Sequence, residues 1–216
     1  MPTVKVLTEY PIAVNSPDHR YPCGVSNDNS TNPEFIKEIE QYFPSDQLNV
    51  LDLGCAGGQM IVDFASNGHT SVGLEGSDYA LRNTAAAGYH NWGKYYRQLL
   101  FNCDVTKPFS IMQEDSPVLF DCITAWEFLE HIRREDLKTV FENVKTHLKP
   151  SGIFCGSLFY ESFKTGDGIE LHQSVYPREV WLNEILSPHF SVVTYPFRSS
   201  VRGSTEGYFC CHKKEK

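Results

Sequence analysis

The segment from Asn49 to Asp63, NVLDLGCAGGQMIVD, constrains the fold of this chain most strongly, because an apolar run stops at glycines and an amphipathic run follows at once. This order predicts a strand, a tight turn and a helix. A second apolar run, Thr70 to Leu74, ends in Glu75. A carboxylate at the tip of the second strand of an α/β nucleotide fold accepts hydrogen bonds from ribose hydroxyls. The sequence therefore predicts that Asp52 and Glu75 lie beside a pocket for an adenosine-bearing small molecule.

The glycine pattern distinguishes between two kinds of cofactor. A dinucleotide-binding loop has the spacing GxGxxG. Here Gly54 is followed by Ala56 in place of the second glycine and by Gln59 in place of the third, while Gly58 completes a GxAxG spacing. In this respect the segment resembles motif I of the class I S-adenosylmethionine-dependent methyltransferases, whose loop wraps that cofactor. A glycine turn between a strand and a helix can also serve packing alone, so the remaining segments must show whether this loop binds a cofactor.

Three later segments have the order and spacing of the same family: LFNCDVTKP from Leu100, PVLFDCITAWEFLEH from Pro117, and LKPSGIFCGSL from Leu148. The resemblance extends from Val50 to the end of the chain. It implies that Asp104 receives the adenine amino group, that the amide of Val105 reaches a ring nitrogen, and that the fourth strand leaves over the cofactor. The cofactor-binding residues that it implies are Asp52, Gly54, Ala56, Gly58, Glu75, Asp104, Val105 and Trp126.

The expected fold is a Rossmann-like, doubly wound α/β domain with a seven-stranded, mostly parallel sheet and helices on both faces. With 216 residues, 41% of them hydrophobic, the chain can bury a core in one compact domain. Residues 1–46 are expected to form a cover segment and a helix, and residues 47–216 the methyltransferase domain. Helices are predicted at Pro33–Phe43, Asp136–His147 and Pro177–Leu186, and closing strands at Ser191–Tyr195 and Tyr208–Cys211.

The segment before the first helix, HRYPCGVSNDNST, is too polar for a core and rich in hydrogen-bonding groups. In the family that this chain resembles, the region before the first strand commonly folds over the active site. Arg20, Tyr21 and Asn27 are therefore candidates for a lid, and Tyr21 for a substrate contact.

Composition excludes several classes of protein. No apolar run is long enough to span a bilayer, and the N-terminus lacks the blocks of a secretory signal, so a cytoplasmic protein without a membrane partner is expected. The seven cysteines form no CxxC pair, and most should be buried as small apolar residues. The net charge of −8 disfavours a nucleic-acid partner. The fourth strand ends in Ala125, Trp126 and Glu127, without the Asn or Asp, prolines and aromatic of base-amino methyltransferases.

Glu127, Glu130 and His131 form an ExxEH pattern, which would place three side chains on one face of a helical turn. Three interpretations remain open. Glu130 and His131 can brace the next helix; His131 can act as a general base; or the set can bind Mg or Mn, as in some family members that methylate catechol-like or terminal ribose hydroxyls.

His172 follows the fifth strand, where the family builds acceptor pockets. It is a candidate base, a fourth metal ligand, or a loop histidine without a special role. The segment FYESFKTGDGIE between that strand and His172 has no periodicity, as expected of a flap. Tyr160 and Glu161 within it are candidate substrate contacts.

The segments DHRYPCGVSNDNST, VGLEGSDY, AWEFLEH and HxSVxPRxxW resemble bacterial methyltransferases associated with polysaccharide and glycoconjugate synthesis. This likeness implies a small-molecule acceptor, with a sugar hydroxyl as the hypothesis. Two other functions stay open: a catalytically silent S-adenosylmethionine-binding domain, and an NAD(P)-dependent oxidoreductase. The oligomeric state is not predicted.

Overall fold

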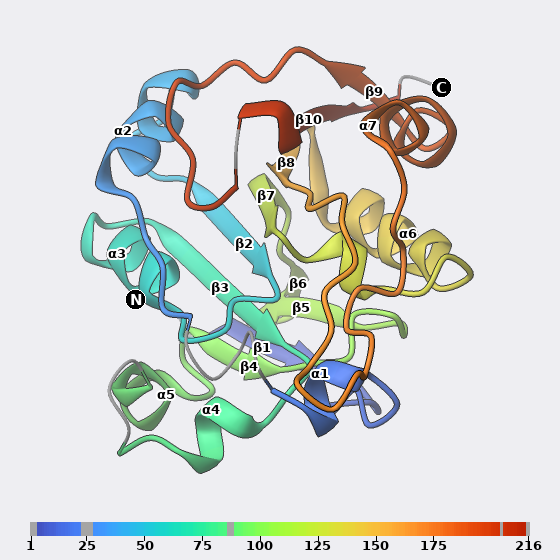
Figure 1. Ribbon diagram of the computed structural model, residues 1–216. Helices are drawn as coiled ribbons and strands as arrows, with labels where there is room; N and C mark the ends of the chain where they lie inside the picture. The colour runs from blue at the N-terminus through green and yellow to red at the C-terminus, as the bar shows by residue number, and fades with distance from the viewer. Residues whose placement is uncertain (1–3, 23–27, 86–88, 204, 215–216) are drawn as a thin grey trace.

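The computed structural model describes residues 4–22, 28–85, 89–203 and 205–214. Its centre is a seven-stranded sheet in the order β4-β3-β2-β7-β8-β10-β9 (Figure 1). β4, β3, β2, β7 and β8 run parallel, and β10 is antiparallel to both β8 and β9. The predicted mostly parallel sheet is therefore confirmed. The strands are β2 Asn49–Leu53, β3 Thr70–Glu75, β4 Leu100–Asn102, β7 Phe120–Trp126, β8 Leu148–Ser157, β9 Phe190–Val193 and β10 Tyr208–Lys213.

Helices cover both faces of this sheet, as predicted. α2 (Pro33–Tyr42) and α3 (Gln59–Ser66) lie on one side in Figure 1, and α6 (Leu137–His147) and α7 (Arg178–Val180) lie on the other. The helix predicted at 177–186 is only partly α-helical, because α7 passes at Trp181–Leu186 into a wider π-helical turn. The short helices α4 Tyr79–Arg82 and α5 His90–Tyr95 lie near the β4 edge (Figure 1).

The local sequence explains α2 well. The side chain of Asn32 accepts a hydrogen bond from the Glu34 amide at 3.0 Å, and Pro33 occupies the first turn, where its missing N–H costs nothing. Phe35, Ile36 and Ile39 are buried. The helix predicted at Pro33–Phe43 is confirmed, and its apolar face serves core packing.

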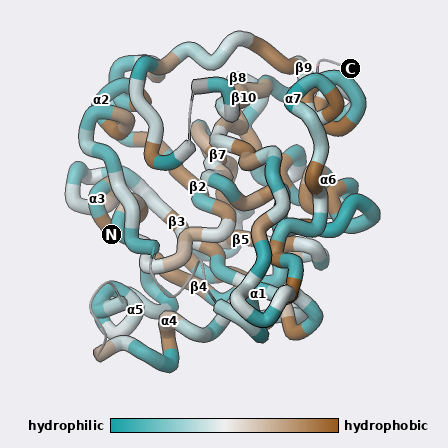
Figure 2. The backbone as a smooth tube through the Cα atoms, in the orientation of Figure 1, coloured by the Kyte–Doolittle hydropathy of each residue, from teal (hydrophilic) through white to brown (hydrophobic). Residues whose placement is uncertain are grey.

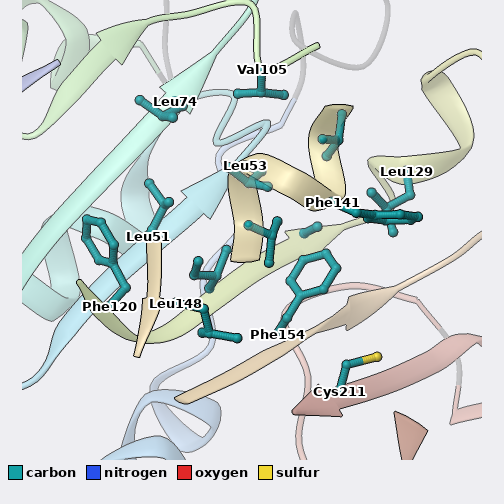
Figure 3. Packing of buried hydrophobic residues seen from close by; sticks show 14 of the residues in the cluster. Leu51, Leu53, Leu74, Val105, Phe120, Leu129, Phe141, Leu148, Phe154 and Cys211 are labelled. Carbon is teal, nitrogen blue, oxygen red and sulfur yellow. The ribbon is translucent and has the colours of Figure 1, made fainter. Parts of the chain in front are cut away.

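The core lies in two layers, because successive residues of a strand face opposite sides of a sheet. Leu51 and Phe154 pack with Phe141 of α6 in one layer, shown in Figure 3. Val50 and Phe64 belong to the other, under α2 and α3. The hydropathy colouring shows apolar strands at the centre of the molecule (Figure 2). The six described cysteines are buried and free, as predicted for most of them: Cys55, Cys103, Cys122, Cys155, Cys210 and Cys211.

A second, three-stranded sheet was not predicted. β1 (Val4–Leu7) pairs antiparallel with β5 (Ser110–Gln113), and β5 pairs with β6 (Ser116–Pro117). These strands are too short for a clear alternation in the sequence, so their pairing depends on contacts between distant segments. The small sheet fastens the N-terminal segment to the body of the domain.

The rest of the N-terminal segment approaches the carboxyl ends of β2 and β3. The Ala13 amide donates to the Gly76 carbonyl at 2.9 Å, and the Gly57 amide donates to the Asp28 carbonyl at 2.9 Å. Between them lies α1 (Pro17–Arg20). The lid candidate Asn27 lies outside the described residues. Within the described ranges, no helix has the length and apolar character needed to cross a membrane.

Candidate active site

A cavity of about 330 Å³ opens at the carboxyl ends of β2, β3 and β7, beside the segment that follows β4. Ligands of open α/β sheets bind at this edge, where the strand order reverses, and the volume is within the usual range for small-molecule pockets. The wall is formed by the N-terminal cover, the glycine loop, the ends of β2 and β3, the segment after β4 and the exit of β7. Gln173 and the loop before β10 complete it.

The backbone of the glycine loop lies close to neighbouring side chains and to the cavity. Gly54 has φ +75° and lines the cavity, and a Cβ there would lie 2.3 Å from the Phe128 ring. Ala56 also lines the cavity, with φ +44°. Gly58 does not line it; with φ +80°, it packs against Leu100, where a Cβ would come within 2.5 Å. Gly58 is therefore required by the fold of the loop rather than by direct access to the cavity.

The amide groups of this loop are already hydrogen-bonded within the protein. Their acceptors come from β3, from the loop itself and from the cover segment. The four bonds are Ala56 N to Glu75 Oε2 at 3.1 Å, Gly57 N to Asp28 O at 2.9 Å, Gly58 N to Cys55 O at 2.8 Å, and Gln59 N to Asn29 Oδ1 at 3.0 Å.

Glu75 and Asp104 both line the cavity, as does Val105. One Glu75 oxygen accepts from Ala56, and the other accepts from the Ser77 amide at 2.8 Å. Burial raises the pKa of Glu75 to about 7, although these backbone bonds act to lower it. Asp104 accepts from both the amide and the hydroxyl of Thr106, at 3.0 and 2.6 Å.

Asp52 lies in β2 and is buried, outside the cavity lining. Its carboxylate accepts a hydrogen bond from the Thr124 hydroxyl at 2.6 Å. Burial raises the pKa of Asp52 to about 8; the Thr124 bond lowers it, and the nearby Asp28 and Glu75 raise it further. Asp52 thus supports the site from beneath, through its hydrogen bond with Thr124.

This raised pKa predicts that stability falls as pH rises. A carboxyl whose pKa is higher in the folded protein binds more protons there than in the unfolded chain. The free energy of unfolding therefore falls as pH rises from the ordinary Asp pKa to about 8. Asp52→Asn should remove this dependence. Between pH 6.5 and 8.5 we expect the free energy of unfolding of wild type to fall by on the order of 2 kcal/mol more than that of the variant. This difference corresponds to roughly 4–8 °C in Tm.

The exposed Asp46 offers a matched control, because Asp46→Asn should retain the wild-type dependence. Differential scanning fluorimetry across this pH range makes the comparison. Parallel curves for wild type and Asp52→Asn would contradict the raised pKa.

The exit of β7 differs from the predicted helical turn. Glu127 has φ +46°, and the helical turn begins only at Leu129 and ends at His131. The Glu127 carboxylate lies 3.3 Å from the Arg202 guanidinium. The prediction that Glu127 shares one face with Glu130 and His131 is therefore wrong, because the left-handed residue turns the chain before the helix starts. Trp126 lines the cavity beside Glu127.

Glu130, His131 and His172 do come together, with one ligating atom of each within 4.8 Å of the others. Glu130 is fully buried; its Oε1 accepts from the Phe159 amide at 2.8 Å, and its Oε2 has no hydrogen-bond partner among the described residues. Burial raises the pKa of Glu130 to about 7, although the neighbouring His131 acts to lower it. A buried carboxylate oxygen without a donor is costly, so it marks a site that calls for explanation.

The two histidines are each fixed through Nδ1. His131 Nδ1 lies 3.1 Å from Asp18 Oδ2, and His172 Nδ1 lies 2.6 Å from the Glu161 carbonyl. Their ring centroids are 4.6 Å apart. Burial lowers the pKa of His131, but the hydrogen bond and charge of Asp18, with Glu130, outweigh it, so that pKa lies above the ordinary value. Burial lowers the pKa of His172.

The predicted substrate contacts do not line the cavity. Tyr21 caps the end of α1 and is exposed. The Tyr160 hydroxyl donates to the Glu206 carbonyl at 2.9 Å. Glu161 has an exposed side chain and holds His172 only through its backbone.

Sequence reasoning missed several charged residues of the lining, among them Asp18, Asp28 and Arg202. Arg202 bonds Asp28 at 2.7 Å across 174 positions, and Asp18 reaches His131 across 113. The Ser-Pro-Asp sequence at the start of α1, with Ser16 as the cap, was the available signal for Asp18. For Arg202 the sequence carried none.

Known proteins share parts of this sequence and its fold. A family model described as a methyltransferase domain matches residues 27–193. The ubiquinone biosynthesis O-methyltransferase of Coxiella burnetii is 29% identical over 136 residues, 62% of this chain and 53% of that protein. The chain thus spans about half the length of the curated relatives it matches.

Two solved structures share the fold. One is a 1,6-didemethyltoxoflavin-N1-methyltransferase of Burkholderia thailandensis with bound S-adenosylhomocysteine, at 18% identity and TM-score 0.58, covering 92% of this chain and 84% of that one. The other is a sugar N-methyltransferase of Streptoalloteichus, at 13% identity and TM-score 0.58, covering 91% and 92%. The chain belongs to the methyltransferase-domain family, and its fold is that of the class I S-adenosylmethionine-dependent methyltransferases.

Proposed function

We propose that this protein transfers the methyl group of S-adenosylmethionine to a hydroxyl of a small-molecule acceptor. The observation that carries this proposal is the charge of the cavity. Three Lys or Arg side chains line it, Lys107, Arg133 and Arg202. Seven carboxyl side chains line it as well: Asp18, Asp28, Glu75, Asp104, Glu127, Glu135 and Asp136. A site of this charge favours a cationic sulfonium donor and repels anions.

The same cavity is unsuited to NAD(P). A pyrophosphate binds dinucleotide folds through free amides of the glycine loop at a helix N-terminus. Here the amides of residues 56–59 are satisfied by the protein's own oxygens, two of which belong to the carboxylate of Glu75 and the side chain of Asn29. This arrangement supports the methyl donor over the oxidoreductase alternative.

The donor, when bound, supplies an electrophilic methyl group whose bonding electron pair remains on sulfur as the acceptor oxygen attacks. The residues of this chain must align the acceptor, exclude water and take the hydroxyl proton. His131 lines the cavity, and Asp18 holds its Nδ1, which leaves Nε2 as the basic nitrogen. We assign His131 as the general base, with Asp18 orienting it and with Glu130 and His172 beside it.

A second route is supported by the buried Glu130 oxygen that has no partner among the described residues. Glu130, His131 and His172 offer one carboxylate and two imidazoles, a donor set that suits Mn or Zn better than Mg, which prefers oxygen ligands. In metal sites, the imidazole nitrogen that does not bind the metal usually hydrogen-bonds a carboxylate or a backbone carbonyl. Nδ1 of both histidines makes a contact of this kind. A cation held there would lower the pKa of the acceptor hydroxyl. Glu127 is outside this set, since it pairs with Arg202.

Chelation separates the two routes. The general-base route predicts that dialysis against EDTA leaves the turnover number unchanged. Loss of turnover that is restored by Mg, Mn or Zn, added separately, would contradict that route and support the cation. Methyl transfer is measured with labelled donor in both conditions.

The acceptor class is proposed to be a sugar or a glycoconjugate precursor. Phe159 and Phe163 are 41% and 44% exposed, and both rings contact His172, with centroids 5.6 and 5.5 Å away. Exposed rings beside the histidine cluster can stack on the apolar face of a sugar ring. The name of the Coxiella relative supports oxygen as the methylated atom.

A panel of acceptors tests this assignment. The protein is incubated with labelled S-adenosylmethionine and with sugar nucleotides, phenols or amines. Label in a sugar nucleotide would support the full proposal, and label only in phenols would retain oxygen but discard the sugar. Turnover confined to amines would discard the hydroxyl acceptor.

A further inference from the structure

The glycine loop has an unusual backbone conformation at Ala56. Gly54, Ala56 and Gly58 have φ values of +75°, +44° and +80°, and of these three only Ala56 carries a side chain. A left-handed residue other than glycine is uncommon, because its Cβ crowds the backbone. Such a residue persists only where its surroundings hold it, and it often marks a functional site. Ala56 lines the cavity, so the contacts that hold it bear on ligand binding.

The helix α5 contacts this loop from outside the cavity. The indole Nε1 of Trp92 donates a hydrogen bond to the Ala56 carbonyl at 2.6 Å. The side-chain amide of Asn91 donates to the Gly57 carbonyl at 3.3 Å and to Gln59 Oε1 at 3.1 Å. Both donors are buried, with Trp92 0% and Asn91 2% exposed, and neither residue lines the cavity. The carbonyl groups of residues 56 and 57 are therefore bonded to α5.

Ala56 is held from two sides. Its amide donates to Glu75 Oε2 at 3.1 Å, in the cavity wall, and its carbonyl accepts from Trp92 on the other side of the loop. Trp92 belongs to a buried apolar cluster with Cys55 and Leu100. Because a close-packed indole has little room to move, its N–H fixes the direction of the Ala56 carbonyl.

We propose that Trp92 is a positioning residue for the methyl donor. Its side chain lies outside the cavity and acts through Ala56, because the indole N–H keeps the loop in its left-handed conformation before the donor arrives. A loop that is already ordered raises affinity, since binding does not have to order it. This inference rests on the proposed function, and it gives α5 a role in donor binding although the helix does not line the cavity.

Substitution of Trp92 by phenylalanine removes the N–H and keeps an aromatic ring. By calorimetry, Trp92→Phe should bind S-adenosylhomocysteine roughly 10-fold more weakly than wild type, as expected for the loss of one buried hydrogen bond. Trp181→Phe is the matched control. Trp181 is also 0% exposed and outside the cavity lining, but its indole nitrogen has no hydrogen-bond partner among the described residues. The control should bind like wild type. Wild-type affinity in Trp92→Phe, or equal losses in the two variants, would overturn the inference.

A second substitution separates positioning from a general loss of stability. Ala56→Gly removes the cost of the left-handed conformation, because glycine adopts positive φ readily. Added to Trp92→Phe, it should restore part of the affinity, so that the double variant binds S-adenosylhomocysteine roughly 3-fold more tightly than Trp92→Phe alone. No recovery would contradict the positioning role.

Hydrogen exchange of the indole N–H groups tests the inference in the wild-type protein, whether or not Trp92→Phe folds. The chain has three tryptophans, so Trp126→Phe and Trp181→Phe identify all three indole signals in NMR spectra. If the Trp92 bond favours donor binding, bound ligand must favour the bond in return. S-Adenosylhomocysteine should therefore slow exchange at Trp92 by a larger factor than at Trp181. Equal factors would overturn the inference and leave the proposed function intact, whereas a wild-type protein that does not bind S-adenosylhomocysteine would overturn both.

Discussion

Replacing His131 by alanine should lower the turnover number by roughly 10²- to 10⁴-fold, the usual contribution of a positioned general base. Affinity for S-adenosylhomocysteine should stay at the wild-type value, because His131 is assigned to the acceptor proton rather than to the donor. Its Nδ1 is held by Asp18, and its ring, which lines the cavity, contacts the ring of His172 behind it. Single-turnover methyl transfer and calorimetry measure the two quantities separately.

The matched control is His90→Ala, since His90 is exposed at the start of α5 and outside the cavity lining. It should retain wild-type turnover. His172→Ala separates the two routes further: the base route predicts a smaller loss than for His131→Ala, and the cation route predicts a similar one. Unaltered turnover in both variants would remove both routes. A wild-type protein that binds the donor but methylates no acceptor would instead support a silent binding domain.

Replacing Glu75 by glutamine should weaken S-adenosylhomocysteine binding by roughly 10- to 100-fold or more. Both carboxylate oxygens accept backbone N–H groups, from Ala56 and Ser77. An amide has one accepting oxygen, so its NH₂ group would face one of these N–H groups and leave it unsatisfied. The variant also loses the charge assigned to the ribose hydroxyls. Both effects disturb the loop that lines the donor pocket.

Glu9→Gln makes the same chemical change at an exposed position and should bind like wild type. Calorimetry with S-adenosylhomocysteine compares the two variants, and circular dichroism verifies that each is folded. Undiminished affinity in folded Glu75→Gln would contradict the role given to this carboxylate.

The fold could be predicted largely because its signals are local. The strand and turn from Asn49 to Gly58 are visible as an apolar run that ends at glycines, and α2 is visible from its cap at Asn32 and its apolar spacing. The small sheet containing β1 and β5 could not be predicted, because two short strands pair across about half of the chain. Glu127 was misjudged because a single left-handed residue reverses the direction of its side chain.

Some site residues could be predicted and others could not, because only local signals are visible in the sequence. Glu75 and Asp104 line the cavity because they follow the ends of parallel strands, a position that the sequence marks. His131 and His172 lie together because the segment after β8 returns past the exit of β7. Arg202 and Asp18 depend on side chains that meet across the whole fold, and no spacing rule relates such positions.

We propose that the cavity over Glu75 and Asp104 binds a cationic sulfonium donor and not a dinucleotide. Isothermal titration calorimetry of the wild-type protein with S-adenosylmethionine, S-adenosylhomocysteine and NADH tests this proposal. Saturable heat is expected with the first two ligands, and none with NADH. A clean NADH isotherm, with no heat from either sulfur compound, would contradict it.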